Sequence, residues 1–581
     1  MSTQTPILPP PIPIPALEQT VERYLERIRP LVATAEYEAA EQTARRFAAG
    51  SGSKLQSALQ AYFDKSAPQS WLVRIWEHSY LSYREELSSN MNYLTTFDPA
   101  KVPHRGSLAE YMAALVHAFT RVYVQHADGT LPVESGRSGP LSMDQFDVVF
   151  GACRIPGSGI CELFIGEKTS KNAHIAVLCR ENIYTLQVTD QDGKTLSVAS
   201  ITDGIARIMA SNDASAPNIG TMTAAKRDHA ALLYKHINGL DARNAANFGL
   251  INSAIFALCI DERGERSQDV ATFEQLYGYG KNRWFEKCFQ LIVGDDYSIG
   301  FNNEHTAYDA AVWISIITGV YADITGGCDG SGSGVAAAIQ RLDWVTDQHA
   351  LDALAKMEAA DIARGKTIPL RTFDFSDFGS GGMKELKCSP DAFFHLALQL
   401  AWYRLRGRID STYEAVSMRQ YHQGRTECMR PSTTLVLDFI TALNEGRPRE
   451  ELVSMARAAF DRHVEMIVQC QQGGGPERHL TALQTMASQQ GMVLSPEEDI
   501  FASAAYKQLK HDTISSSGLF TKGLGLFAFG PVVEDGFGVG YVIDAGSIRL
   551  CISCFEQNAA LHEPFIREIG NALRDLRDLL K

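Results

Sequence analysis

The sequence predicts an α+β protein, on three observations. Helical and strand-like patterns are mixed along the chain without strict β-α-β alternation. The chain has 581 residues, and because single cores rarely grow beyond about 250–300 residues, more than one domain is expected. Hydrophobic residues make up 45% of the sequence and charged residues 21%, which is typical of a soluble globular protein with a large core.

The predicted elements begin with helices and continue with strands. Apolar residues recur at helical spacing over residues 16–32, after a proline-rich start. Further helices are predicted at residues 35–48, 54–64 and 107–126. Residues 174–188 form two β-rich runs around a polar turn, and residues 285–305 predict strand, Asp-Asp turn and strand. This pattern places His305 at or just past a strand end, a common position for reactive side chains.

The second half contains the clearest helix start in the sequence. Ser389 suits the N-cap, Pro390 the first turn and Asp391 the positive end of the helix dipole. Residues 524–555 predict three strands joined by tight turns, an antiparallel meander, and a final helix is expected at 558–580.

Composition and motifs argue against several classes of function. The net charge of -14 opposes general binding to nucleic acid or anionic membranes, because phosphate attraction requires a basic face. No metal site is indicated, since the eleven cysteines form no zinc-like double pair, and the Cys551–Cys554 pair lies in a strand-like run. Gly-x-Ser-x-Gly is absent, and the glycine-rich segment 325–335 is interpreted as a loop, although it could be a weak dinucleotide fingerprint.

The expected location is cytoplasmic. The N-terminus resembles neither a signal peptide nor an Arg-rich transit peptide, and no disulfide framework is implied. The most apolar internal run, residues 310–322, is too short and too polar to span a bilayer. We expect no transmembrane segment, no nucleic-acid partner and a monomeric protein.

An ordered set of segments carries the functional signal. In chain order they are LPPPIPIPALEQTVERYL, WLVRIWEHSYLSYR, FGACRIPG, NRWFEKCFQLIVGDD, EHTAYD, SPDAFFHLALQLAWYRL, TYEAVSMRQYHQGRTE, GGGPERHL and FGPVVEDGFGVGY. Each is weak alone, but the set, at compatible separations, resembles the choline/carnitine O-acyltransferases along almost the whole chain. The resemblance implies two similar α/β domains, each a mixed sheet flanked by helices, with an active-site tunnel between them. The implied parts are an N-terminal helical segment (1–80) packing with the C-terminal domain, a domain carrying His305 (81–365), and a domain carrying the coenzyme A and carnitine sites (366–581).

The resemblance makes His305, in the family's His-x-x-x-Asp position, the catalytic base. An imidazole can deprotonate an attacking hydroxyl and then reprotonate a leaving thiolate, so no covalent acyl-enzyme is needed. Asp309 is the family's acid four positions on, and it is expected to pair with Arg425 as support for the site. Ala310 follows this acid where the family usually has glycine.

The family's Ser-Thr-Ser triplet, 15 residues before Gly530, corresponds to the three serines at 515–517. The third, Ser517, is implied as the donor to the tetrahedral oxyanion. Ser515 is assigned to the carnitine site. The alternative is a polar loop that happens to be rich in serine.

Three further positions match the residues that bind the carboxylate of carnitine in the family: Tyr413, Thr426 and Arg478. Choline has no carboxylate, so an arginine that can form bidentate hydrogen bonds with a carboxylate favours carnitine as the acceptor. Taken separately, each could be a surface polar group.

The implied coenzyme A-binding residues are Lys384, Lys387, Asp391 and Ser417. Two departures accompany them: Ser380 stands where the family has lysine, and Gly518 where glutamine is common. Phe527, 12 positions after Ser515, matches the residue that lines the acyl pocket and predicts short acyl groups, unless its side chain points to the opposite face of its strand.

The resulting hypothesis is a carnitine O-acetyltransferase-like enzyme that moves a short acyl group between coenzyme A and carnitine. One alternative is a family acyltransferase that uses choline or another alcohol. Another is a non-catalytic acyl-CoA-binding protein, although such a protein has no physical need to keep His305, the serines and Arg478 in register.

Overall fold

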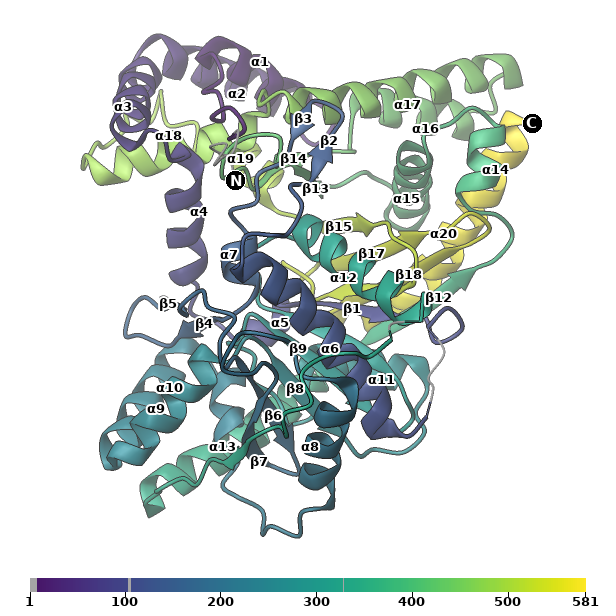
Figure 1. Cartoon of the computed structure of the whole chain (residues 1–581). Helices are drawn as coiled ribbons and strands as arrows, with labels where there is room; N and C mark the ends of the chain where they lie inside the picture. Colours follow the sequence, from purple (N-terminus) through teal and green to yellow (C-terminus); the bar gives the residue numbers. More distant parts are fainter. Residues whose placement is uncertain (1–7, 103–105, 328) are drawn as a thin grey trace.

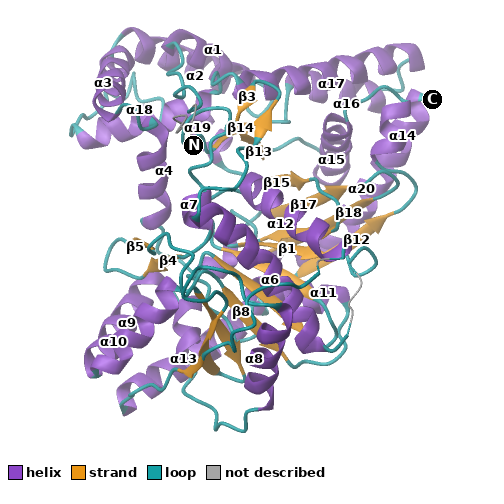
Figure 2. Ribbon diagram, in the orientation of Figure 1, coloured by secondary structure: helices purple, strands orange, loops and turns teal. Residues whose placement is uncertain are grey.

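A computed structural model describes residues 8–102, 106–327 and 329–581 of the chain. It has two mixed β-sheets, each covered by helices, that meet in the middle of the molecule (Figures 1 and 2). The predicted combination of mixed sheets and flanking helices is therefore confirmed. Among the helices in the described ranges, none is long and apolar enough to cross a membrane.

The first sheet has eight strands in the described part of the chain. Their spatial order is β11 (Ile339–Arg341), β7 (Asn182–Gln187), β6 (His174–Cys179), β8 (Ala257–Asp261), β9 (Phe289–Gly294), β10 (Ile299–Asn303), β1 (Tyr93–Phe97) and β16 (Leu524–Phe529). The pairs β6–β8 and β8–β9 are parallel and the others antiparallel. The hairpins predicted at 174–188 and 285–305 are both present, as β6–β7 and β9–β10.

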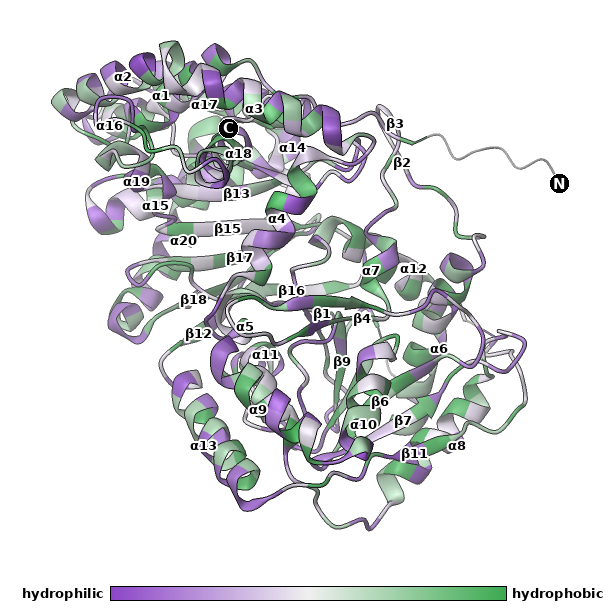
Figure 3. Ribbon diagram, turned by 90° about the vertical axis from the view of Figure 1, so that its left-hand side faces the viewer, coloured by the Kyte–Doolittle hydropathy of each residue, from purple (hydrophilic) through white to green (hydrophobic). Residues whose placement is uncertain are grey.

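Helices cover both faces of this sheet, because its strands carry apolar residues on both sides. One face packs against α6 (Leu108–Ala127), α8 (Val198–Ala210) and α12 (Ala310–Thr325). The other packs against α9 (Arg227–Leu240), α10 (Ala242–Ser253) and α13 (Gln348–Gly365). Figure 3 shows the hydrophobic colour along β6 and β9 and mixed colouring on the outer helix α13, as amphipathic packing requires.

The second sheet contains six described strands. Their spatial order is β12 (Leu370–Phe375), β18 (Ile548–Cys554), β17 (Phe537–Ile543), β15 (Ile514–Leu519), β13 (Thr412–Ser417) and β14 (Thr426–Met429). One face packs against α15 (Pro390–Arg406), α16 (Thr434–Asn444), α17 (Arg449–Gln471) and α20 (Ala559–Leu580). Helix α15 begins as predicted, with the Ser389 hydroxyl accepting a hydrogen bond from the Ala392 backbone N–H.

One prediction about the C-terminal strands is wrong. Residues 524–555 do not form a three-stranded meander, because β16 pairs antiparallel with β1 of the first sheet, with Phe527 opposite Thr95. Of the three strands in this segment, only β17 and β18 pair with each other, as antiparallel neighbours in the second sheet. The strand β16 therefore belongs to the first sheet, although it lies in the predicted domain 366–581 and the other strands of that sheet lie in the predicted domain 81–365.

The N-terminal helices pack beside the second sheet rather than the first. They are α1 (Leu17–Ile28), α2 (Thr34–Ala49), α3 (Ser51–Ser66) and α4 (Trp71–Leu81). They share a core with α18 (Pro476–Gln489) and α19 (Ala504–Lys510) (Figure 1). Helix α4 descends from this group toward the junction of the sheets.

The remaining described elements are short or peripheral: α5 (Leu87–Asn90), β2 (Ser135–Gly136), β3 (Gly139–Pro140), α7 (Phe146–Val149), β4 (Ala152–Ile155), β5 (Glu162–Ile165), α11 (Gln268–Tyr277), α14 (Ser380–Glu385) and the two 3-10 helices η1 (Ile219–Ala224) and η2 (Glu556–Asn558).

Candidate active site

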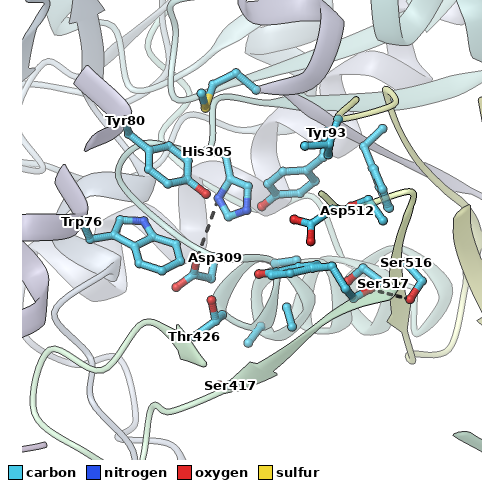
Figure 4. A pocket seen from close by; sticks show the side chains of 18 of the residues that line it. Trp76, Tyr80, Tyr93, His305, Asp309, Ser417, Thr426, Asp512, Ser516 and Ser517 are labelled. Atoms are coloured by element: carbon cyan, nitrogen blue, oxygen red, sulfur yellow. Dashed lines mark hydrogen bonds and ion pairs between the residues drawn. The ribbon is translucent and has the colours of Figure 1, made fainter. Parts of the chain in front are cut away.

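A cavity of about 510 Å³ lies where the two sheets meet. Its walls come from helix α4, strands β1, β13, β15 and β16, and the segment after β10. Of the residues predicted from the sequence, it brings together His305, Asp309, Tyr413, Ser417, Thr426, Arg478, Ser515, Ser517 and Phe527. Figure 4 shows several of them around one space. Residues from both sheets thus meet at one site.

His305 follows β10 directly and presents one free ring nitrogen. Its Nδ1 lies 3.0 Å from the carbonyl oxygen of Tyr308. Because a carbonyl can only accept, Nδ1 carries the proton and the lone pair lies on Nε2. The ring is held between Tyr80 and Tyr93, with edge-to-face centroid distances of 5.5 and 5.1 Å. Burial lowers the pKa of His305, an effect that the Asp309 carboxylate partly opposes, so the imidazole is neutral and basic near neutral pH.

Asp309 and Arg425 form the buried pair that the resemblance implied. Arg425 Nε donates to Asp309 Oδ2 at 2.8 Å, and Nη2 lies 3.2 Å from Oδ1. The same guanidinium donates to the carbonyl oxygens of Thr306 at 2.8 Å and of His305 at 3.1 Å. Gln145 holds the pair from the other side, donating to Asp309 Oδ2 and accepting from the Asp309 N–H at 2.8 Å. Arg425 does not line the cavity. Its hydrogen bonds to the carbonyl oxygens of His305 and Thr306 hold the loop that carries His305.

The three serines differ in what their hydroxyls can do. They lie on β15, and side chains on a strand alternate between faces. The Ser516 hydroxyl donates to the carbonyl oxygen of Tyr413 at 2.7 Å and is thereby occupied. All three residues line the cavity, but the side chains of Ser515 and Ser517 lie on the face opposite to that of Ser516 (Figure 4 labels Ser516 and Ser517). Ser517 is thus placed where a hydroxyl can donate to a bound oxygen.

The glycine at position 518, where glutamine is common in the family, has a steric reason. A Cβ at this position would lie 2.2 Å from the ring of Tyr541, the neighbouring residue on β17. Any side chain here would displace that ring. The glycine is therefore required by close packing of Tyr541 against β15.

Arg478, Tyr413 and Thr426 form one polar group at the wall of the cavity. Arg478 Nε donates to the Thr426 carbonyl oxygen at 2.9 Å, and Nη2 donates to the Tyr413 hydroxyl at 3.1 Å. The guanidinium carbon lies 4.4 Å from the centroid of the Trp76 ring, a cation–π contact. These contacts orient the guanidinium, and Nη1 has no hydrogen-bond partner among the described residues. A carboxylate is the anion that such a planar fork fits best.

The predicted coenzyme A residues are divided between two places. Ser417 lines the cavity, whereas Lys384, Lys387 and Asp391 do not. The two lysines are exposed at and just after the end of α14. Arg457 donates to the carbonyl oxygen of Lys387 and so adds a third cationic side chain beside them.

Asp391, whose side chain is 34% exposed, belongs to a polar network beneath the second sheet whose other members are buried. It pairs with His463 at 2.8 Å and accepts from the Tyr541 hydroxyl at 2.6 Å. Tyr541 also lies 2.7 Å from Glu414, which pairs with His395 at 2.9 Å. Burial alone would raise the pKa of Asp391, but the histidines hold it below its usual range. The carboxylates and histidines here already pair with one another.

Phe527 is buried and lines the cavity together with Tyr93. Its centroid lies 5.9 Å from that of Tyr93, in an edge-to-face contact. The two rings form a continuous wall next to His305. The alternative orientation, with Phe527 on the opposite face of β16, is thereby excluded.

Several residues of the site were not predicted from the sequence. Gln145, which holds Asp309, has no motif or spacing that marks it. Trp76 and Tyr80 lie in the segment WLVRIWEHSYLSYR, which the resemblance included without giving them a role. Tyr93 and Asp512 also line the cavity, and Asp512 could have been noticed from its place three residues before the serines.

The chain is similar to known proteins along nearly its whole length. The model of the choline/carnitine O-acyltransferase family matches residues 12–570, so the chain belongs to that family. It is 28% identical to the mitochondrial carnitine O-palmitoyltransferase 2 of Bos taurus, over 98% of this chain and 92% of that protein. It is also 30% identical to the carnitine O-acetyltransferase of Homo sapiens, over 98% of this chain and 93% of that protein.

Among solved structures, the chain is similar to the first condensation domain of the CDA synthetase, with a TM-score of 0.39 and 9% identity over 87% of this chain and 95% of that one. The starter condensation domain of rhizomide synthetase RzmA gives a TM-score of 0.32 and 10% identity over 87% and 95%. These similarities are too remote to bear on activity.

Proposed function

We propose that the protein transfers a short acyl group reversibly between coenzyme A and the hydroxyl of carnitine. The observation that carries the proposal is the convergence of a free imidazole nitrogen on His305, the Ser517 hydroxyl and the Arg478–Tyr413 pair on one cavity. Family membership supports acyl transfer, and the two named relatives are enzymes of carnitine.

In the proposed mechanism His305 acts as both base and acid. Its Nε2 takes the proton from the acceptor hydroxyl as that oxygen attacks the thioester carbonyl carbon. The carbonyl oxygen becomes an oxyanion, to which the Ser517 hydroxyl donates a hydrogen bond, a contact often worth about 2.7–4 kcal/mol. When the carbon–sulfur bond breaks, the thiolate of coenzyme A takes the proton back from Nε2. No side chain forms a covalent bond with the acyl group.

Carnitine is favoured over choline by the group around Arg478. Its guanidinium is oriented by Thr426 and Tyr413 and stacked on Trp76, and within the described ranges Nη1 has no hydrogen-bond partner. A guanidinium that is already oriented gains most binding free energy from a carboxylate, which carnitine has and choline lacks. Asp309 and Arg425 do not contact the acceptor in this proposal but hold the loop that carries His305.

A short acyl group is favoured by the wall that Phe527 and Tyr93 form beside His305. A close-packed wall of two aromatic rings does not readily give way to a long alkyl chain. The coenzyme A part of the acyl-CoA substrate carries phosphates, and Lys384, Lys387 and Arg457 supply positive charge that suits them.

The test is a thiol-release assay with acetyl-CoA and either carnitine or choline, followed by acyl-CoA substrates of increasing length. We expect turnover with carnitine, much weaker turnover with choline, and a decline from acetyl and propionyl to octanoyl. Equal rates with the two acceptors would contradict the carboxylate assignment. Binding of acyl-CoA without turnover of any alcohol would favour the non-catalytic alternative.

A further inference from the structure

The cavity contains an acidic side chain that the proposed mechanism does not use. Asp512 lines it and is 17% exposed, and together with Asp309 it provides the only carboxylates in the lining among the described residues. Figure 4 shows its carboxylate on the side of the cavity away from Thr426, with His305 between and above them. Its partner Arg430 lies 5.8 Å from the centroid of the Tyr413 ring, so the acid enters the cavity near Tyr413.

The carboxylate of Asp512 is oriented by Arg430, which does not line the cavity. Its Oδ1 accepts a hydrogen bond from Arg430 Nη1, and Arg430 is almost fully buried. Arg430 also donates to both oxygens of Glu477, at 2.6 and 2.7 Å, and to the Ser411 hydroxyl at 3.0 Å. In the described structure Oδ2 of Asp512 has no hydrogen-bond partner. A carboxylate held at one oxygen, with the other free at a cavity wall, is a binding group for a cation.

The surroundings of Asp512 suit one kind of cation. Aromatic rings line the same cavity: Tyr93, Tyr413, Phe527 and Phe529. Aromatic faces attract quaternary ammonium groups, which have no N–H to donate and therefore need no hydrogen-bond acceptor. A carboxylate beside such rings adds a direct charge interaction in a partly desolvated site.

We propose that Asp512 recognises the quaternary ammonium group of the acceptor. The acceptor is then a zwitterion whose reacting hydroxyl lies between its charges, with the carboxylate at Arg478, the cation at Asp512 and the hydroxyl at His305. This inference rests on the proposed function, because carnitine has this arrangement of groups. It adds a residue that selects the acceptor by its positive charge.

The experiment compares carnitine with its carbon isostere, in which a tert-butyl group replaces the trimethylammonium group. The two have nearly the same shape and differ by one positive charge. The KM of each is measured with saturating acetyl-CoA for the wild type, for Asp512→Asn and for Asp535→Asn. Asp535 is a matched control, because it pairs with His511 and its side chain is 55% exposed, outside the cavity lining.

For the wild type we expect a KM about ten- to a hundredfold lower for carnitine than for the isostere, as for one charge-assisted contact. In Asp512→Asn the KM for carnitine should rise toward that of the isostere, while the KM for the isostere and for acetyl-CoA stay unchanged. Asp535→Asn should behave as the wild type. Arg430 retains Glu477 and Ser411 in the Asp512 variant, so the protein should fold, which the thermal unfolding midpoint checks.

Two outcomes would overturn the inference. One is a wild type that turns over both acceptors with the same KM, a comparison that needs no variant. The other is a variant in which the KM for carnitine rises no more than that for the isostere. Failure of the wild type to use carnitine at all is a different result, since it contradicts the proposed function itself.

Discussion

Replacing Arg478 with asparagine tests the assignment of carnitine as the acceptor. The contacts of this residue allow the expected change in the KM for carnitine to be estimated. The guanidinium donates to a carbonyl oxygen of Thr426 and to the hydroxyl of Tyr413, both uncharged groups. The variant breaks no side-chain hydrogen bond to a carboxylate. The buried Glu427 loses Arg478 as a nearby positive charge but keeps its hydrogen bonds from the backbone N–H groups of Cys428 and residue 478, so we expect the protein to fold, which the thermal unfolding midpoint checks. What is lost is a charged donor for the acceptor carboxylate. A hydrogen bond to a charged group contributes about 1.5–3 kcal/mol, which corresponds to a rise of about 10- to 150-fold in the KM for carnitine.

The assay is thiol release at varied carnitine and varied acetyl-CoA. We expect the KM for carnitine to rise by this factor while the KM for acetyl-CoA changes less than about twofold, because the lost contact is to the acceptor alone. Arg478→Lys should give an intermediate value, since an ammonium group keeps the charge but not the planar fork. If both KM values rise together, Arg478 supports the structure and the carnitine assignment loses its main argument.

Three further predictions follow from the site. His305→Ala should lower kcat by at least about 10²–10⁴ with an unchanged circular dichroism spectrum, and near-normal turnover would contradict the base assignment. Because burial lowers the pKa of His305, its basic form persists below pH 6.5; kcat/KM should therefore fall only as the pH drops below that value, and a half-maximal point above pH 7 would refute it. Phe527→Gly should open space for about three methylene groups, worth about 0.8 kcal/mol each, and raise kcat/KM for octanoyl-CoA up to about 50-fold; a wild type that already prefers octanoyl-CoA to acetyl-CoA would exclude this role.

Local signals in the sequence predicted those features whose causes are local. Ser389 and Pro390 mark the start of α15 because a cap satisfies backbone groups of the same turn. The strand–turn–strand pattern ending at His305 was readable because alternation and turn residues act within a few positions. Most of the predicted cavity residues were identified by resemblance, since short motifs keep their chemistry when the rest of the chain varies.

Pairing between distant segments could not be predicted in the same way. The alternating pattern of residues 524–529 is equally suitable for a hairpin with β17 and for the pairing with β1 that the structure has. That pairing is what brings Phe527 against Tyr93, a residue that no motif marked.

The sequence by itself determined the family and led to the proposal of His305 as the base and of the carboxylate-binding group, because these are sets of residues whose types and order carry the chemistry. Only the tertiary structure decided that Gln145 holds Asp309, that Asp391 is engaged with His463 and Tyr541, and that Asp512 enters the cavity. The physical reason is that a side chain's partners are set by packing between segments far apart in the chain, and the free energy of that packing depends on the whole fold rather than on any local pattern.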